Sequence, residues 1–289
     1  MRVSDIPVGA VRDVCSAFAS MGSSRRTGVR VTVVVGPGAP SGLVRALKGA
    51  LVPETPYGLV HVEAPLVSGA LVVNPDADLA VVCAGGQRQA AAYARALSEA
   101  GVPVAIAVES GLEAPEVFEL ADAPGVSLVA GSSPDVLLDK LAQWMADTCD
   151  ARVALAASFA FCRRAVTMRL VHERSAQNAA IGLLPLGSAA DMPVMAANQT
   201  LMALDVAASY GQGAGSERVA EALSIAAVAL LARRASRLAV RSLPGLGWLV
   251  RATVAYGTTA LLGHALVAAH ELRGRARASG GLPVCPRAS

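Results

Sequence analysis

Five short apolar runs separated by helical stretches recur through residues 28–149, and this alternation most constrains the fold. The runs are nearly continuous in apolar residues and rich in valine, which is typical of strands buried on both faces of a parallel sheet. They cover Val29–Val35, Gly58–Glu63, Ala77–Cys83, Pro103–Val108 and Val126–Ala130. Amphipathic helices are expected over Gly42–Leu51, Gln87–Ala100, Ala114–Ala121 and Pro134–Thr148. The alternation predicts a three-layer, doubly wound α/β domain with about five parallel strands.

A change of composition near residue 150 predicts a second domain. Strand signals end there, and stretches rich in Ala, Leu and Val predict helices at roughly 151–174, 176–184, 192–210, 217–240 and 248–274. We therefore expect four segments along the chain. These are a leading helix with a basic linker over 1–27, the α/β domain over 28–149, an all-helical domain over 150–274, and a disordered tail over 275–289.

Charge is divided unevenly between the two halves of the chain. Residues 1–149 carry 10 Lys and Arg against 15 Asp and Glu, whereas residues 150–289 carry 15 Arg against 7 Asp and Glu. A basic helical part is typical of proteins that meet an anionic membrane surface or an acidic protein partner. Nucleic acid is not an expected partner, because aromatic residues make up only 3% of the chain and no recognition motif is present.

The cysteines and the amino terminus indicate the compartment. Five scattered cysteines lack the spacing of metal ligands and are typical of reduced thiols in the cytosol. The first 22 residues carry charges within what would have to be an apolar signal core. We therefore expect a cytoplasmic location and no metal site.

The turn after the first apolar run, residues 36–42, reads GPGAPSG and raises the question of phosphate binding. A working phosphate loop continues with Lys and then Ser or Thr, but here Gly42 is followed by Leu43 and Val44. Pro37 and Pro40 also lack the amide N–H groups that would bind a phosphate.

Three interpretations of this turn remain open. It is a structural strand-to-helix turn, or it binds an anion or nucleoside phosphate without metal, through Gly36, Gly38, Ser41 and Gly42. The third interpretation is a variant dinucleotide fingerprint, in which Glu63 at the end of the second strand meets the ribose.

Other elements of GTPase chemistry are missing from the same domain. Glu109 and Ser110 stand where a GTPase has Asn-Lys-x-Asp, and we expect them to cap the next helix. No Asp-x-x-Gly occurs between Leu59 and Ala84. The domain resembles a GTPase fold without its chemistry, so we predict no catalytic residue and no cofactor. The alternative is a nucleotide-binding switch or enzyme, for GTP or a dinucleotide, that uses the nonstandard turn.

Two segments of the helical part carry a family resemblance. Within residues 163–211, a helix that contains Gln199 ends in Tyr210-Gly211, and within 244–265 a Pro-x-x-Gly segment leads to Thr259-x-x-x-Gly263. This pattern resembles the bacterial family catalogued as domain of unknown function 697. The resemblance implies a preceding GTPase-like domain, with the strand order 2-1-3-4-5, and for some relatives an inner-membrane location.

Several polar residues of the helical part are interface candidates. Asn198 and Asp205 share one helical face, and with Gln199 they form either a polar surface for a partner or a hydrogen-bonded group in the core. A basic stripe, made of Arg233, Arg234, Arg237 and Arg241, is either solvated or in contact with anionic headgroups.

The run Ala252–Ala269 has no Lys, Arg, Asp or Glu, but it contains His264 and is borderline for a membrane span. The sequence thus predicts a non-catalytic, pseudo-GTPase-like protein whose basic, apolar helical domain associates with a membrane or docks a partner. A soluble protein-interaction module is the remaining alternative.

Overall fold

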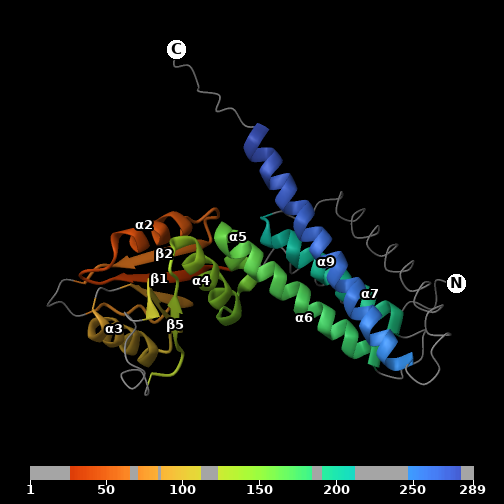
Figure 1. Ribbon diagram of the computed structural model, residues 1–289, viewed down its shortest axis with the longest axis horizontal. Coiled ribbons are helices and arrows are strands. Elements are labelled where there is room, and N and C mark those ends of the chain that lie inside the picture. Colours follow the sequence, from red (N-terminus) through yellow and green to blue (C-terminus); the bar gives the residue numbers. More distant parts are fainter. Residues whose placement is uncertain are drawn as a thin grey trace, which may run out of the picture. The chain divides into compact units, whose positions relative to one another are not determined.

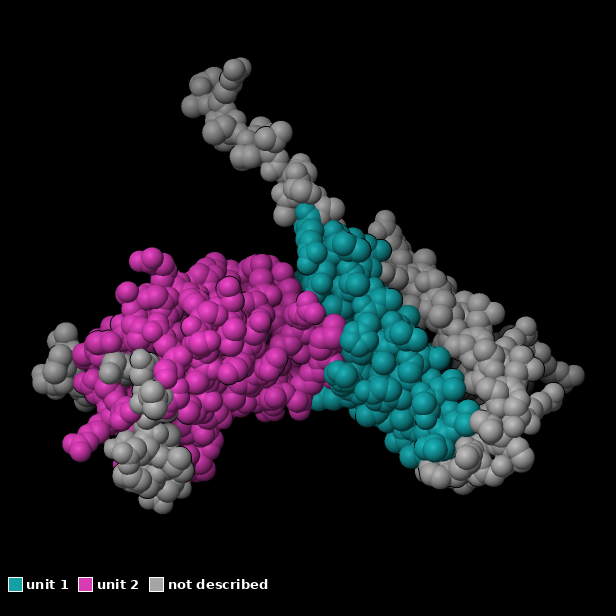
Figure 2. Space-filling model, in the orientation of Figure 1, with its two compact units in different colours: residues 1–19, 170–289 teal, residues 20–169 magenta. Residues whose placement is uncertain are grey.

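The computed structural model describes residues 27–65, 71–83, 86–111, 123–183, 191–211 and 247–280. The chain divides into two compact units, which Figure 2 shows in different colours. We call residues 20–169 the first unit (unit 2 in the key of Figure 2) and residues 170–289 with residues 1–19 the second unit (unit 1 in the key). The leading helix expected within residues 1–27, the expected helices over 114–121 and 217–240, and the stretch 281–289 of the expected tail lie outside the described residues.

The first unit is built on a parallel sheet of five strands, shown with its helices in Figure 1. Its strands lie in the order β2-β1-β3-β4-β5, which is the order that the resemblance implies. The strands are β1 (Val29–Val35), β2 (Gly58–Glu63), β3 (Leu79–Cys83), β4 (Val104–Val108) and β5 (Val126–Ala130). The buried residues of β3 and β4 explain why these sequences read as unbroken apolar runs.

Helices cover both faces of this sheet, as the doubly wound prediction requires. On one face, α3 (Gln87–Glu99) packs through Tyr93 and Leu97 on a core that includes Val82 and Ile106. On the other face lie α2 (Ser41–Ala50) and α4 (Pro134–Thr148), which contact each other. Three layers therefore bury the central strands.

The helix α4 begins where its sequence predicts. Ser133 is the N-cap residue, its hydroxyl accepts a hydrogen bond from the Val136 N–H at 3.4 Å, and Pro134 occupies the first turn. A glycine is required just before it, since a Cβ on Gly131 would lie 2.5 Å from the Leu137 nitrogen. The end of β5 and the start of α4 thus depend on local residues.

The first unit continues past the boundary expected at residue 149. It includes α5 (Arg152–Ser158), a 3-10 turn η4 (Ala160–Cys162) and the start of α6 (Arg163–Leu183). Glu54 N–H donates to the Ser158 carbonyl at 2.8 Å, and the Thr55 and Ser158 hydroxyls lie 2.8 Å apart. A Cβ on Gly58 would lie 2.8 Å from the Ser158 Cβ, so α5 packs closely on β2.

In the second unit, the described elements are helices: the rest of α6, then α7 (Asp191–Ser209) and α9 (Gly247–Gly280). The helices expected at roughly 151–174 and 176–184 divide at a different place: the chain is interrupted between α5 and α6, and α6 runs through residue 175 as one helix. Ser175 is fully buried there, so tertiary packing holds a residue of only moderate helix propensity. Similarly, α9 extends beyond residue 274 to Gly280.

Candidate functional site

The glycine-rich turn joins β1 to α2 at the carboxyl edge of the sheet. Gly38 has a φ of 72°, a conformation that glycine adopts without strain. The Gly36 N–H donates to the Cys83 carbonyl at 2.7 Å, and the Ala39 N–H donates to the Gly36 carbonyl at 3.2 Å. With the two prolines, four of the five residues 36–40 therefore offer no amide to a phosphate.

A carboxylate from this chain lies beside the start of α2. A Cβ placed on Gly42 would be 3.8 Å from Oε1 of Glu109, the residue that follows β4. The first turn of α2 has no acidic residue of its own, and its N-cap, Pro40, makes no side-chain cap. Because the amino end of a helix favours negative charge, Glu109 stands where an anionic ligand would be held.

The thiol of Cys83, which ends β3 at this edge of the sheet, is not activated as a nucleophile. Burial, and to a smaller extent the Glu109 charge, raise the pKa of Cys83 to about 12. Burial also raises the pKa of Cys149 to about 11 and raises the pKa of Cys162. A thiol is nucleophilic as its thiolate, so these three cysteines are inert at neutral pH.

Glu63 ends β2, as the sequence predicts, and its carboxylate is engaged within its own strand. Its Oε1 lies 2.5 Å from Nε2 of His61, two residues earlier on the same face. Because β2 is an edge strand, its backbone pairs with β1 alone in the sheet order. A ribose contact by Glu63 stays a prediction.

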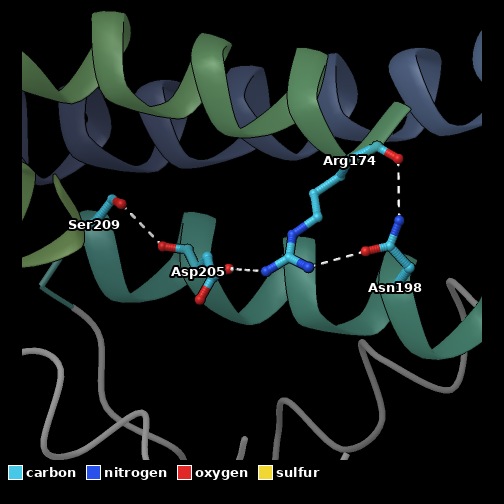
Figure 3. A network of polar contacts seen from close by, with 4 residues as sticks. All are labelled: Arg174, Asn198, Asp205 and Ser209. Atoms are coloured by element: carbon cyan, nitrogen blue, oxygen red, sulfur yellow. Dashed lines mark hydrogen bonds and ion pairs between the residues drawn. The ribbon is translucent and has the colours of Figure 1, made fainter. Parts of the chain in front are cut away.

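In the second unit, a polar network joins α6 to α7 (Figure 3). The Arg174 guanidinium donates to Oδ1 of Asn198 at 2.9 Å and to Oδ2 of Asp205 at 3.0 Å. The Asn198 side-chain amide donates to the Arg174 carbonyl at 3.0 Å. The shared face that the sequence predicts for Asn198 and Asp205 is therefore the face that meets α6.

The network continues to α9 through buried amides. Asn178 Oδ1 accepts from the Asn198 amide at 2.9 Å, and Asn178 Nδ2 donates to the Thr259 hydroxyl at 2.9 Å. Gln199 Nε2 donates to the same hydroxyl at 3.0 Å, and the hydroxyl donates to the Ala255 carbonyl at 2.8 Å. One threonine of α9 thus joins α6 and α7, and a satisfied network of this kind fixes how helices pack.

Burial changes the acidity of the one carboxylate in this network. Burial raises the pKa of Asp205 above its ordinary value, and the Arg174 charge and hydrogen bond lower the pKa only in part. Chemically, the arrangement holds a carboxylate against a guanidinium and amides, and it positions no nucleophile.

The sequence left open whether Asn198, Gln199 and Asp205 form a core group or a partner surface. The structure brings them together with Asn178, and Asn198 and Gln199 are buried inside the second unit. Sequence reasoning missed the bonds of Arg174 and Thr259, although Thr259 lies in a quoted motif. The basic stripe, Arg233, Arg234, Arg237 and Arg241, lies outside the described residues.

The remaining motif residues also form helix contacts. Gly211 has a φ of 72° and its N–H donates to the Ala208 carbonyl, so it ends α7 as a glycine C-cap. The Tyr210 ring stacks on His270 of α9 with centroids 5.1 Å apart. A Cβ on Gly263 would lie 2.4 Å from Val171 of α6.

One helix of the described residues, over Leu249–Arg275 of α9, is long and apolar enough to cross a membrane by length and composition. This is weak evidence, because core helices of soluble proteins have the same properties. Within the described ranges, no group of three or more His, Cys, Asp or Glu side chains could hold a metal ion. Comparison of the chain with family models, with curated proteins and with solved structures finds no match.

Proposed function

We propose that the protein is a non-catalytic, pseudo-GTPase-like protein that associates with an anionic membrane surface through its basic helical part. In this proposal, residues 28–149 retain the framework of a nucleotide-binding fold without nucleotide chemistry. The resemblance to domain of unknown function 697 and the all-helical nature of residues 150–274 belong to the same proposal.

The placement of Glu109 carries the first half of the proposal. A nucleotide phosphate at the start of α2 would meet a like charge there, and like charges at short range disfavour binding. The prolines and the backbone bonds of the turn remove further amide donors. The turn lacks the lysine that would offset this repulsion.

The charge of the second half supports the membrane part. Residues 150–289 carry 15 Arg against 7 Asp and Glu. The part of α9 over Leu249–Arg275 is long and apolar enough to cross a membrane by length and composition. A basic residue near an anionic bilayer contributes about 1 kcal/mol to binding. Several arginines on one side would therefore hold the protein at such a surface without a membrane span.

A nucleotide panel tests the first half. We expect no change of melting temperature or calorimetric heat with GTP, ATP, NAD or NADP at millimolar concentration. Glu109→Gln should gain weak binding of inorganic phosphate, since it removes the like charge, whereas Glu99→Gln on α3 should not. Saturable binding of any of these nucleotides by the unaltered protein would overturn the non-catalytic interpretation.

Flotation with vesicles tests the membrane part. We expect the protein to float with vesicles rich in anionic lipid, not with neutral vesicles, and to be released by high salt. Replacing Arg233, Arg234, Arg237 and Arg241 with Gln should abolish flotation. Replacing Arg45, Lys48, Arg88 and Arg95, which are exposed on the first unit, removes the same charge and should leave flotation unchanged. Protein that stays in the soluble fraction under every condition would refute this part.

A further inference from the structure

An apolar stripe on α9 lies on the side away from the helices that pack on it. Its four side chains follow at intervals of four, three and four residues and so share one face: Leu261, Ala265, Ala268 and Leu272. All four are exposed, and Leu261 and Leu272 have 72% and 64% of their surface accessible. The opposite face of α9, with Thr259 and Gly263, is buried. Alternating intervals of four and three residues are the spacing at which two helices pair along an apolar seam.

The order of residues along this stripe is the same when it is read in either direction. Leucine, alanine, alanine and leucine lie symmetrically about a point midway between Ala265 and Ala268. A twofold axis through this point, perpendicular to α9, places Leu261 of one chain level with Leu272 of a second chain. The same axis places Ala265 level with Ala268. The stripe is therefore complementary to itself in an antiparallel pair, with small side chains where the two helices cross.

The residues beside the stripe also match in this arrangement. His264 and Glu271 lie on the same side of the stripe, because seven residues make almost two helical turns. The twofold axis keeps that side common to both helices, so His264 of each chain lies beside Glu271 of the other. On the opposite side Leu262 lies beside Ala269. An imidazole thus meets a carboxylate, and an apolar side chain meets an apolar side chain.

Charge favours the antiparallel arrangement over a parallel one. Arg275 follows Leu272 by three residues and continues the line of the stripe. In a parallel pair, Arg275 would meet its own copy, and two like charges would repel each other. In the antiparallel pair, Arg275 lies level with Thr258 of the other chain, which carries no charge.

We propose that the stripe of Leu261, Ala265, Ala268 and Leu272 is the contact of a symmetric dimer, in which the α9 helices of two copies of the chain pack antiparallel. Two leucines, two alanines and the residues beside them supply less than the roughly 800 Å² per partner of a stable interface. The dimer is therefore reversible and forms at micromolar concentration. The proposal does not rest on the proposed function, because it is tested without lipid or nucleotide.

Sedimentation over a range of protein concentrations tests the surface. We expect an equilibrium between monomer and dimer in the full chain. Leu261→Asp should raise the dissociation constant at least tenfold, since a charge then replaces an apolar side chain at the contact. The matched control is Leu249→Asp, because Leu249 is 48% exposed on the same helix but lies off the stripe. Circular dichroism confirms that both variants stay folded, and the control should dimerise as the unaltered protein does.

Exchange of charges tests the register. His264→Glu sets two carboxylates against each other across the dimer and should weaken it at least threefold. Adding Glu271→Lys to His264→Glu should restore the dimer, because opposite charges then face each other. Gln143→Glu, at an exposed position of α4, adds a negative charge elsewhere and should change nothing.

Cross-linking between two kinds of chain tests the antiparallel direction, in a Cys15→Ser, Cys285→Ser background. Chains with Leu261→Cys are mixed with chains with Leu272→Cys and treated with a short bismaleimide. We expect linked dimers in the mixture and far fewer in either sample alone. In a dimer of identical variants, the two introduced thiols are eleven residues apart in level, which is about 16 Å along the helix axis.

Four results would overturn the proposal. The first is a monomer at every concentration, and the second is a dimer that Leu261→Asp leaves unchanged. The third is efficient linking of Leu261→Cys chains to one another, which would assign a different register. The fourth is linking that appears only with anionic vesicles, which would assign the stripe to lipid.

Discussion

At the scale of residues, the side chain of Thr259 connects three helices of the helical unit. Its hydroxyl accepts hydrogen bonds from Asn178 and Gln199 and donates one to its own helix. Asn178 is fully buried and Gln199 is buried, so neither side-chain amide could turn to water if the Thr259 hydroxyl were lost. A buried donor without an acceptor costs about 1–3 kcal/mol.

We therefore expect Thr259→Val to lower the free energy of unfolding by about 2–4 kcal/mol, because two buried amide donors lose one acceptor. Thr258→Val is the matched control, since the Thr258 hydroxyl only donates to the Val254 and Ala255 carbonyls of its own helix. Its loss should cost less than about 1 kcal/mol. Urea unfolding of both variants measures the difference, and equal values would contradict this role of Thr259.

Arg174 is expected to stabilise the unit by pairing a half-buried charge. Arg174→Met leaves the Asp205 carboxylate without its guanidinium and should cost about 2 kcal/mol, somewhat less than the roughly 3–5 kcal/mol of a fully buried pair. Arg169→Met, on the same helix, breaks a more exposed pair with Asp147 and should cost about 0–1 kcal/mol. Urea unfolding measures both variants. Adding Asp205→Leu to Arg174→Met should recover part of the loss, and a further loss would contradict the proposed cause.

Asp205 should give the unit a pH dependence of known sign. Its pKa is raised on folding, so the folded state holds the proton more tightly than the unfolded state. This stabilising contribution is complete below the ordinary pKa of 3.8 and is lost as pH rises through the raised value. Asp205→Asn should lack this dependence, and Arg174→Met should enlarge it, because Arg174 lowers the Asp205 pKa. Unfolding measured across this pH range tests the sign.

At the scale of elements, α6 and α9 approach closely at two glycines. A Cβ on Gly263 would lie 2.4 Å from Val171 Cγ2, and a Cβ on Gly182 would lie 3.2 Å from the Ala252 Cα. Both glycines are buried in helices, where glycine is otherwise unfavourable. The Val171 side chain, packed against the backbone of α9, is therefore the physical reason for Gly263 of the Thr-x-x-x-Gly motif.

We expect Gly263→Ala to destabilise the protein by about 1–3 kcal/mol through overpacking against Val171. Gly257→Ala, on the same helix, should stabilise it by about 0.5–1 kcal/mol, since nothing lies within 4 Å of its added Cβ. Thermal or urea unfolding separates the two signs. Val171→Ala should rescue Gly263→Ala in part, and absence of rescue would contradict the steric cause.

The strands were predictable from sequence because each is a short run rich in apolar residues between helical stretches, although only β3 and β4 are buried along their whole length. The bounds of β1, β2 and β5 match the prediction, and β3 and β4 begin one or two residues later. The bounds of α6 were less predictable, because the sequence does not show that Ser175 is buried by packing within one continuous helix. Arg174 and Glu109 could not be placed, because their partners lie on other elements and no spacing in the sequence reports such contacts.

At the scale of the whole molecule, the border between the two units falls within α6, after Arg169, and not at the end of α4, which is the helix that follows the last strand. Leu155 and Phe159 are fully buried, and Arg163 pairs with Glu54 and donates to the Ala156 carbonyl. Residues 150–169 therefore belong energetically to the α/β unit. Burying a side chain such as Phe159 contributes about 1.5–3 kcal/mol.

This border predicts how truncated proteins behave. Residues 27–169 should unfold in one cooperative transition, whereas residues 27–149 should be less stable by several kcal/mol, because β2 loses its contacts with α5. Urea titrations followed by circular dichroism compare the two. Equal midpoints would show that α5 and η4 add nothing to the first unit.

The threonine that completes the polar network also sets an order of events during synthesis. All five strands of the sheet precede α6 in the sequence, so they have been synthesised before α6 is complete. Thr259, in contrast, is added 81 residues after Asn178, the residue of α6 to which it is bonded. At about 5–20 residues per second, the ribosome needs roughly 4–16 s to supply that hydroxyl after Asn178 has been added. In that interval the amides of α6 and α7 lack their acceptor. A transcript that stops before codon 259 would thus yield a folded first unit with an incomplete second one, and proteases would act on that part of the chain.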